Sequence, residues 1–219
     1  GNSQMGRDVV YVESMVRGQS FVVATSHLES PTEFKAGPAK TRQIATRKEQ
    51  LQQAFELLKR LADKSTRKPE IVYAGDMNWN DSECGAPTLA EGWKDVWLTL
   101  NPQDPGYTYD GPRNPMLVNK LKGRPDRVFC RLGVTRPATI RMIGTERIDN
   151  VTYMKKLGPK EIELPVAISD HFGLMTELRP NDGSAPKSLP SDGHGEESPG
   201  KARAGIGGLF NFFKPKGQQ

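Results

Sequence analysis

The sequence lacks the features that would tie it to a membrane, an oxidising compartment or a repeat architecture. It has no long apolar segment and no signal-peptide pattern, so nothing in it indicates secretion or a membrane span. Its two cysteines, Cys84 and Cys130, lie far apart and are most simply free thiols. No internal repeat is visible, and 219 residues are enough for one good-sized domain.

The charge balance is basic but moderate. A formal net charge of +5 and a pI of about 9.2 suit a polyanionic partner without establishing one. Residues 35–68 contain ten basic side chains against three acidic ones. Like charges on a helix are usually a solvated outer face, so this stretch does not by itself predict a DNA contact.

The most informative stretch is Ile71–Asn78, a short apolar run that ends in polar residues. The apolar part is typical of a buried strand, and alternation puts Asp76 and Asn78 on one side of the chain. Sites in α/β proteins collect where strands end, and a carboxylate beside an amide can orient a water and accept its proton. Taken by itself, the stretch is better explained as a strand followed by an Asp/Asn turn.

Two further apolar runs carry acid/base residues at their ends. Phe21–Ser30 carries His27 near its end, and a third run begins just after Asp170 and His171. Three strands with such ends predict one convergent site. The remaining histidine, His194, lies near the C-terminus, and we expect no role for it.

These stretches belong to an ordered set of five motifs. In chain order they are Ser26-His-Leu-Glu-Ser30, Gly75-Asp-Met-Asn78, Tyr107-Thr-Tyr-Asp110, Asp126-Arg-Val-Phe129 and Ser169-Asp-His171. The set and its order resemble the endonuclease/exonuclease/phosphatase superfamily of metal-dependent phosphoesterases. Within that superfamily, the first and third motifs are most similar to those of the 5′-tyrosyl-DNA phosphodiesterases. The resemblance covers roughly residues 5 to 178.

The resemblance implies an α/β fold, a four-layer α/β sandwich in which two packed mixed sheets are flanked by helices. The many strands and few helices agree, because they favour two packed sheets over a doubly wound parallel sheet. Residues 1–179 would be the C-terminal part of the catalytic domain, without the half that supplies the family's metal-binding Glu. Residues 180–219, rich in Gly and Pro, are expected to form a disordered tail.

The resemblance also implies a catalytic role for five residues. Asp76 would accept the proton of an attacking water that Asn78 orients. His171 and His27 would hydrogen-bond the phosphate oxygens and oppose their developing charge. Asp126 would orient His171, as a carboxylate commonly does for an imidazole.

Substrate and metal contacts follow from the same resemblance. Ser30, Arg47 and Tyr109 would bind the substrate, with Tyr109 able to stack on a base. Asp170 would lie in the shell of a Mg²⁺ or Mn²⁺ ion that polarises the phosphate. The principal metal carboxylate of the family belongs to the half that we expect to be missing.

The implied function is Mg²⁺-dependent hydrolysis of the 5′-phosphotyrosyl-DNA bonds that trapped topoisomerase leaves, in DNA repair. The partner would be DNA with a 5′-tyrosyl adduct, no membrane would be involved, and the location would be nuclear, or nuclear and cytoplasmic. Two alternatives stay open. The chain could belong to another nuclease or phosphatase branch of the superfamily, or be an inactive truncated form that acts as a binding or scaffold protein.

Local patterns predict the elements between the motifs. Trp93 and Trp97 are expected to anchor the core. The period of three to four in residues 40–63 predicts a helix. Residues 79–91 are expected to be a loop, and no firm prediction is made for 145–166. Strands are expected at about 9–16, 21–25, 71–76, 126–131, 138–143 and 169–178.

A short apolar segment near the C-terminus suggests one further partner. Leu209, Phe212 and Phe213, followed by basic residues, resemble the peptide motif that docks on the DNA sliding clamp. The first position of that motif is normally Gln, and here it is Ile206. The alternative is that the C-terminus is disordered or that this apolar segment folds back on the domain.

Overall fold

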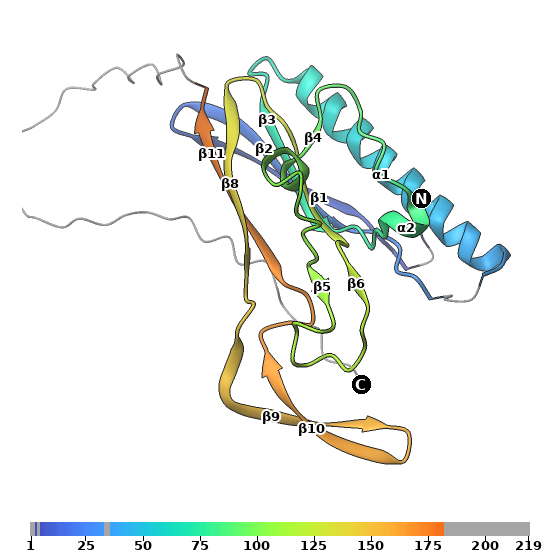
Figure 1. Ribbon diagram of the computed structural model, residues 1–219. Helices are drawn as coiled ribbons and strands as arrows, with labels where there is room; N and C mark the ends of the chain where they lie inside the picture. Colours follow the sequence, from blue (N-terminus) through green and yellow to red (C-terminus); the bar gives the residue numbers. More distant parts are fainter. Residues whose placement is uncertain (1–2, 4, 33–35, 182–219) are drawn as a thin grey trace, which may run out of the picture. The chain divides into compact units, whose positions relative to one another are not determined.

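The computed structural model describes residues 3, 5–32 and 36–181 (Figure 1). The sliding-clamp prediction for Leu209, Phe212 and Phe213, and most of the expected tail, lie outside these residues. None of the helices in the described part of the chain is long and apolar enough to cross a membrane.

A five-stranded mixed sheet forms the centre of the described fold, in the order β1-β2-β3-β7-β4. Strands β2 and β3 are parallel, and the other neighbours are antiparallel. The strands are β1 (Val9–Val16), β2 (Gln19–His27), β3 (Glu70–Asp76), β7 (Asp126–Arg131) and β4 (Lys94–Asp95). The strands expected at 9–16 and 21–25 are confirmed as β1 and β2, which form a hairpin.

The turn of this hairpin has two residues. Val16 pairs with Gln19, and the residues between them, Arg17 and Gly18, have φ values of 49° and 78°. Positive φ at both central positions is the backbone of a tight hairpin turn whose twist matches the flanking strands.

Helix α1 (Pro38–Lys64) covers one face of the sheet (Figure 1). It supplies the crossover that a parallel pair such as β2 and β3 requires. Its apolar stripe, including Leu51, Phe55 and Leu58, is buried, and Phe55 packs against Tyr73 of β3 and Phe129 of β7. The periodicity of residues 40–63 therefore predicted both the helix and its buried face.

The opposite sheet face is covered in part by a second, two-stranded sheet. Strands β8 (Thr135–Ile143) and β11 (Gly173–Pro180) pair antiparallel, and α3 (Val96–Leu100) packs beside them. A second apolar cluster lies between these layers, with Trp97 and Val128 among its buried members. Helix, sheet and sheet follow one another as in the predicted sandwich.

The local structure adds to the sequence analysis in two regions. Residues 147–167, nearly all of which received no firm prediction, form the hairpin β9 (Arg147–Leu157) and β10 (Lys160–Ala167). The expected loop 79–91 contains a short helix, α2 (Asp81–Cys84), whose first turn is capped by the Asn80 side chain. The other short elements are β5 (Tyr109–Asp110) and β6 (Lys122–Gly123).

Side chains expected in the core are found there. Trp93 and Trp97 are buried, as predicted. Cys84 and Cys130 are free thiols, as predicted; both are also buried, and burial raises the pKa of Cys130 to about 11. A thiol with that pKa is unreactive at neutral pH.

Candidate active site

Three polar residues lie in a row across the ends of three adjacent strands. His27 of β2 is paired with Asp76 of β3, and Asp76 is paired with Asp126 of β7. Directly paired residues point to the same face of a sheet. Because Tyr73 and Phe129 lie on the α1 face, Asp76 and Asp126 lie on the opposite one. Strand pairing thus brings together three residues that are far apart in the sequence.

His171 joins this row from the segment that precedes β11. Its Nδ1 lies 2.9 Å from Asp126 Oδ2. The segment is fixed by hydrogen bonds from its backbone N–H groups, because Phe172 N–H donates to Thr108 O at 2.7 Å and His171 N–H donates to Ser169 Oγ at 3.1 Å. Asp126 therefore lies where it can orient His171, as expected.

A second histidine–carboxylate contact lies beside the first. His27 Nε2 is 3.3 Å from Asp76 Oδ2, with the His27 side chain half exposed and Asp76 one-fifth exposed. The Tyr109 ring meets the His171 ring edge-on, at 5.3 Å between centroids. The predicted catalytic residues and one predicted substrate contact are thus close together.

The surroundings shift the pKa values of these groups in different directions. Burial, followed by the charge of Asp126, raises the pKa of Asp76 above its ordinary value. Burial acts to lower the pKa of His171, but its hydrogen bond to Asp126 and the nearby carboxylates outweigh burial and raise this pKa to about 9. Burial lowers the pKa of His27 more than Asp76 raises it. The site therefore combines a more basic carboxylate with one charged and one largely neutral imidazole.

Asn78 is held by the neighbouring loop in a left-handed conformation, with φ of 47°. Its backbone N–H donates to Asp76 Oδ1 at 2.8 Å, and its Nδ2 donates to Leu28 O at 2.9 Å and Ser30 Oγ at 3.2 Å. These bonds fix the side-chain amide through its nitrogen. The amide oxygen, Oδ1, is left available to accept a bond from a water.

Sequence reasoning missed Arg7, whose guanidinium donates to Ser30 Oγ at 2.7 Å. Its positive charge also contributes to the lowered pKa of His27. Arg7 sits in a short polar stretch without periodicity, so no sequence pattern could place it. It adds a cation to the side of the site that Ser30 occupies.

The two remaining predicted residues differ in their surroundings, since one is buried and the other is exposed. Arg47 is 1% exposed and directs its Nη1 at Glu29 O, 3.3 Å away, so it supports the loop before Ser30 instead of facing solvent. Asp170 is exposed next to His171 and accepts a bond from Ser169 Oγ at 3.3 Å. The roles predicted for Arg47 and Asp170 stay predictions.

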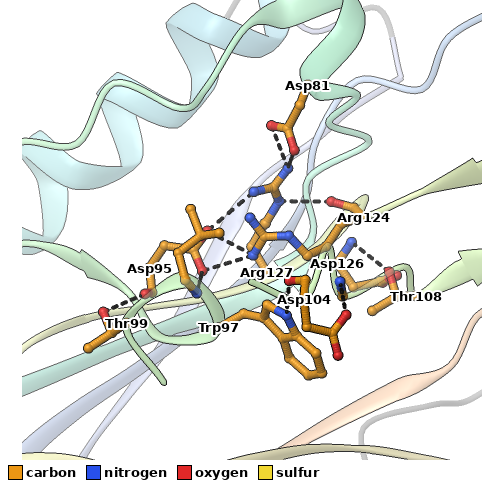
Figure 2. Close-up of polar contacts among 11 residues, drawn as sticks. Asp81, Asp95, Trp97, Thr99, Asp104, Thr108, Arg124, Asp126 and Arg127 are labelled. Atoms are coloured by element: carbon orange, nitrogen blue, oxygen red, sulfur yellow. Dashed lines mark hydrogen bonds and ion pairs between the residues drawn. The ribbon is translucent and has the colours of Figure 1, made fainter. Parts of the chain in front are cut away.

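A buried ionic network supports the row from the α1 side of the sheet. Figure 2 shows Arg127 between two carboxylates: its Nη2 donates to both oxygens of Asp81 at 2.8 and 2.9 Å, and its Nη1 lies 3.2 Å from Asp95 Oδ2. Arg124 Nη1 donates to both oxygens of the same Asp95, at 2.9 and 3.0 Å. Arg127 also directs its Nε at Arg124 O, 2.8 Å away.

This network fixes the backbone on both sides of Asp126. Arg124 and Arg127 are 4% and 1% exposed, so their charges depend on these partners. Between them, Pro125 O accepts a bond from Met77 N–H at 2.9 Å, which joins the start of β7 to the exit of β3. The sequence did not reveal the network, because its partners are up to 46 residues apart.

Three potential metal ligands meet in the site. One ligand atom from each of Asp76, Asp126 and His171 lies within 4.8 Å of the others, a set that could hold a divalent metal. The 2.9 Å contact of His171 with Asp126 is however a hydrogen-bond distance, which requires a proton that a shared ion would displace. The pair therefore fits a proton-sharing role better than joint metal ligation.

Several known proteins are similar to this chain, although no family model matches it. Tyrosyl-DNA phosphodiesterase 2 of Rattus norvegicus is 30% identical over 185 residues, which cover 81% of this chain and 43% of the relative. The protein of the same name from Gallus gallus is 28% identical over 181 residues, covering 79% of this chain and 42% of the relative. The chain thus spans less than half the length of these curated relatives.

Solved structures show the same similarity. D. rerio TDP2 complexed with single strand DNA product matches with a TM-score of 0.62 at 25% identity, covering 81% of this chain and 64% of that one. An endonuclease/exonuclease/phosphatase family protein from Bacteroides thetaiotaomicron matches with a TM-score of 0.51, covering 78% and 54%. Its 17% identity supports the fold alone. The chain is thus similar in sequence and in fold to the tyrosyl-DNA phosphodiesterase 2 proteins, and it shares its fold with an endonuclease/exonuclease/phosphatase family protein.

Proposed function

We propose that this chain carries active-site residues of a 5′-tyrosyl-DNA phosphodiesterase that acts in nuclear DNA repair. The observation that carries the proposal is the convergence of two histidine–carboxylate pairs, His27–Asp76 and His171–Asp126, at the end of one sheet. Similarity to the tyrosyl-DNA phosphodiesterase 2 proteins supports the choice of substrate.

Hydrolysis of a phosphotyrosyl bond needs an in-line water, neutralisation of charge on the phosphate oxygens and departure of the tyrosyl oxygen. Asp76 is the proton acceptor for the water, and its raised pKa makes it a stronger base than an exposed carboxylate. Asn78 orients the water through Oδ1. The tyrosyl oxygen leaves as a phenolate, a better leaving group than an alkoxide, so no dedicated acid is assigned.

The two histidines stabilise the phosphate oxygens in different ways. His171 is protonated at neutral pH, because its pKa of about 9 lies well above 7, and its Nε2–H donates to an oxygen while Asp126 holds Nδ1. His27 directs Nε2 toward Asp76, so Nδ1 donates only in the protonated ring. A phosphate anion beside His27 would itself favour that form.

A divalent cation, Mg²⁺ or Mn²⁺, is part of the proposal. Such an ion is commonly held by one or two carboxylates, waters and substrate phosphate oxygens, and the exposed carboxylate of Asp170 fits one of these positions. When bound, the ion would supply additional neutralisation of the phosphate charge.

The test is a panel of three substrates: a 5′-tyrosyl oligonucleotide, an abasic duplex and poly(A). We expect turnover of the tyrosyl substrate only, first with this chain and, if it is inactive, with a version extended to the length of the curated relatives. Cleavage of abasic DNA or poly(A) instead would assign another branch of the superfamily. Binding of tyrosyl-DNA without any hydrolysis in both versions would support the binding or scaffold alternative.

Mutation tests the residue assignments on the same substrate. Asp76→Asn and His171→Ala should each reduce turnover by at least about 10²-fold, the usual scale for a proton acceptor or a charge stabiliser, while binding survives. His194→Ala changes the one histidine that belongs to none of the five sequence motifs, so it is the matched control and should have no effect. Near-normal turnover of Asp76→Asn or His171→Ala would reject the assignment.

A further inference from the structure

The β9–β10 hairpin is a two-stranded sheet that is not hydrogen-bonded to the other sheets of the described fold (Figure 1). It lies between β8 and the segment that carries His171. Isolated two-stranded hairpins are marginally stable in water, and most of this one is exposed. Val151 and Leu157 are 43% and 40% exposed, so the hairpin presents apolar surface that a partner could cover.

The strand register divides the side chains of residues 151–164 between two faces of different chemistry. In each of three successive pairs, Tyr153 with Leu164, Lys155 with Ile162 and Leu157 with Lys160, both side chains point to the same face. Together with Val151 they form what we call the basic-apolar face. The opposite face consists of Thr152, Met154, Lys156, Glu161 and Glu163.

The two faces of the hairpin also differ in charge. The basic-apolar face carries Lys155 and Lys160, which form no ion pair within the described residues, and it has no acidic side chain. On the opposite face, Lys156 lies 3.6 Å from Glu161, and Glu163 accepts a bond from Thr152. An anionic partner would therefore meet unpaired positive charge on one face and net negative charge on the other.

The basic-apolar face is also the one that turns toward the site. The Tyr153 hydroxyl donates to Met116 O at 2.9 Å, in the loop that joins β5 to β6. That loop follows β5, whose Tyr109 ring contacts His171, and its Asn114 donates to Ser169 O at 2.9 Å. The hairpin thus continues the surface that surrounds the histidine.

We propose that the basic-apolar face binds the single-stranded nucleic acid that leads away from the site. Lysines suit its phosphates, while the tyrosine and aliphatic side chains suit bases that are not covered by a complementary strand. The inference rests on the proposed function for the identity of the polyanion. It goes beyond that function by assigning an accessory binding arm to residues outside the catalytic motifs.

Binding of a 5′-phosphorylated single-stranded oligonucleotide, followed by fluorescence anisotropy, tests the inference. Lys155→Glu and Lys160→Glu should each weaken binding by about tenfold, and together they should reduce the slope of log affinity against log salt by about 1.4, two single-strand phosphate contacts. The control is Lys156→Glu, which makes the same change of charge one residue away on the opposite face. It should leave both quantities nearly unchanged.

The inference would be overturned if Lys155→Glu and Lys156→Glu lost the same oligonucleotide affinity, or if the slope of log affinity against log salt did not change. It would also be overturned if the basic-apolar face bound polyglutamate more tightly than the oligonucleotide, which would indicate an acidic protein partner. Circular dichroism verifies that each variant is folded. Hydrolysis of tyrosyl-DNA, measured in parallel, separates the two proposals. Turnover without face-specific binding rejects only the arm, and face-specific binding without turnover rejects only the enzymatic proposal.

Discussion

Gly75 occupies a position on β3 where a side chain has no room. A Cβ there would lie 2.0 Å from the backbone oxygen of Ser26 on the neighbouring parallel strand. A glycine at the end of an apolar run is often the start of a turn. The structure gives a different reason, because Gly75 is paired within the sheet and permits two backbones to approach closely.

We expect Gly75→Ala to reduce the free energy of unfolding by about 2–4 kcal/mol, because the obstructing atom is backbone and cannot rotate away. Gly37→Ala is the matched control. Its φ of 159° is nearly the 157° of Gly75, but a Cβ there meets nothing within 4 Å. Urea denaturation of both variants measures the difference, and similar losses for the two would show that backbone strain, not close approach, makes Gly75 necessary.

At the same scale, the sequence predicted much of the candidate site. His27, Asp76 and His171 could be selected because each lies at the end of an apolar run, where strand ends converge, and Asp126 could be selected through the resemblance to a known family. Burial could not be predicted for Arg47, since a charged residue in a basic helix is normally solvated. Its position depends on how the Glu29 loop packs against α1, a contact between distant segments.

Among the elements, α2, β4 and β7 are joined by the Arg127 network in addition to strand pairing and apolar packing. Arg127→Met should reduce the free energy of unfolding by about 3–5 kcal/mol, because it leaves Asp95 buried with one partner fewer. Asp81→Asn, which alters a half-exposed partner of the same arginine, should cost about 1 kcal/mol or less. Thermal or chemical denaturation compares them, and equal effects would mean that the burial of Asp95 does not set the cost of losing Arg127.

The elements that sequence reasoning missed share a physical cause. In the β9–β10 hairpin, clear alternation is confined to the four residues from Glu161 to Leu164, and the apolar side chains of this stretch are only partly buried. Asn150 also has a positive φ, 57°, which interrupts the period of two within β9. By contrast, α1 was predicted almost to its ends because one of its faces is buried along its length.

For the molecule as a whole, the two faces of the central sheet are unequally covered. The side chains of β1 on the sheet face opposite α1 are largely exposed. Val10, Val12 and Val16 are 64%, 53% and 50% exposed. Within the described residues, β1 is also the edge strand of the sheet. An edge that combines apolar side chains with unpaired backbone groups promotes association.

We therefore expect this chain to self-associate at high concentration. Val12→Lys should raise the dissociation constant by about tenfold, because a buried valine contributes about 1.5 kcal/mol that a lysine cannot. Leu98→Lys alters a residue of similar exposure, 44%, on α3 and is the control. Sedimentation velocity over a concentration series gives both constants, and an equal response of the two variants would exclude β1 as the contact.

The pairing of β2, β3 and β7 has a further consequence for how such a protein can diversify. His27, Asp76 and Asp126 hold their places through the hydrogen-bond ladder, whatever the length of the segments that link their strands. Insertions into those linking segments leave the row intact, so they are free to accumulate. A single residue inserted inside β3, ahead of Asp76, would move the Asp76 side chain to the opposite face of the sheet, the face that packs against α1.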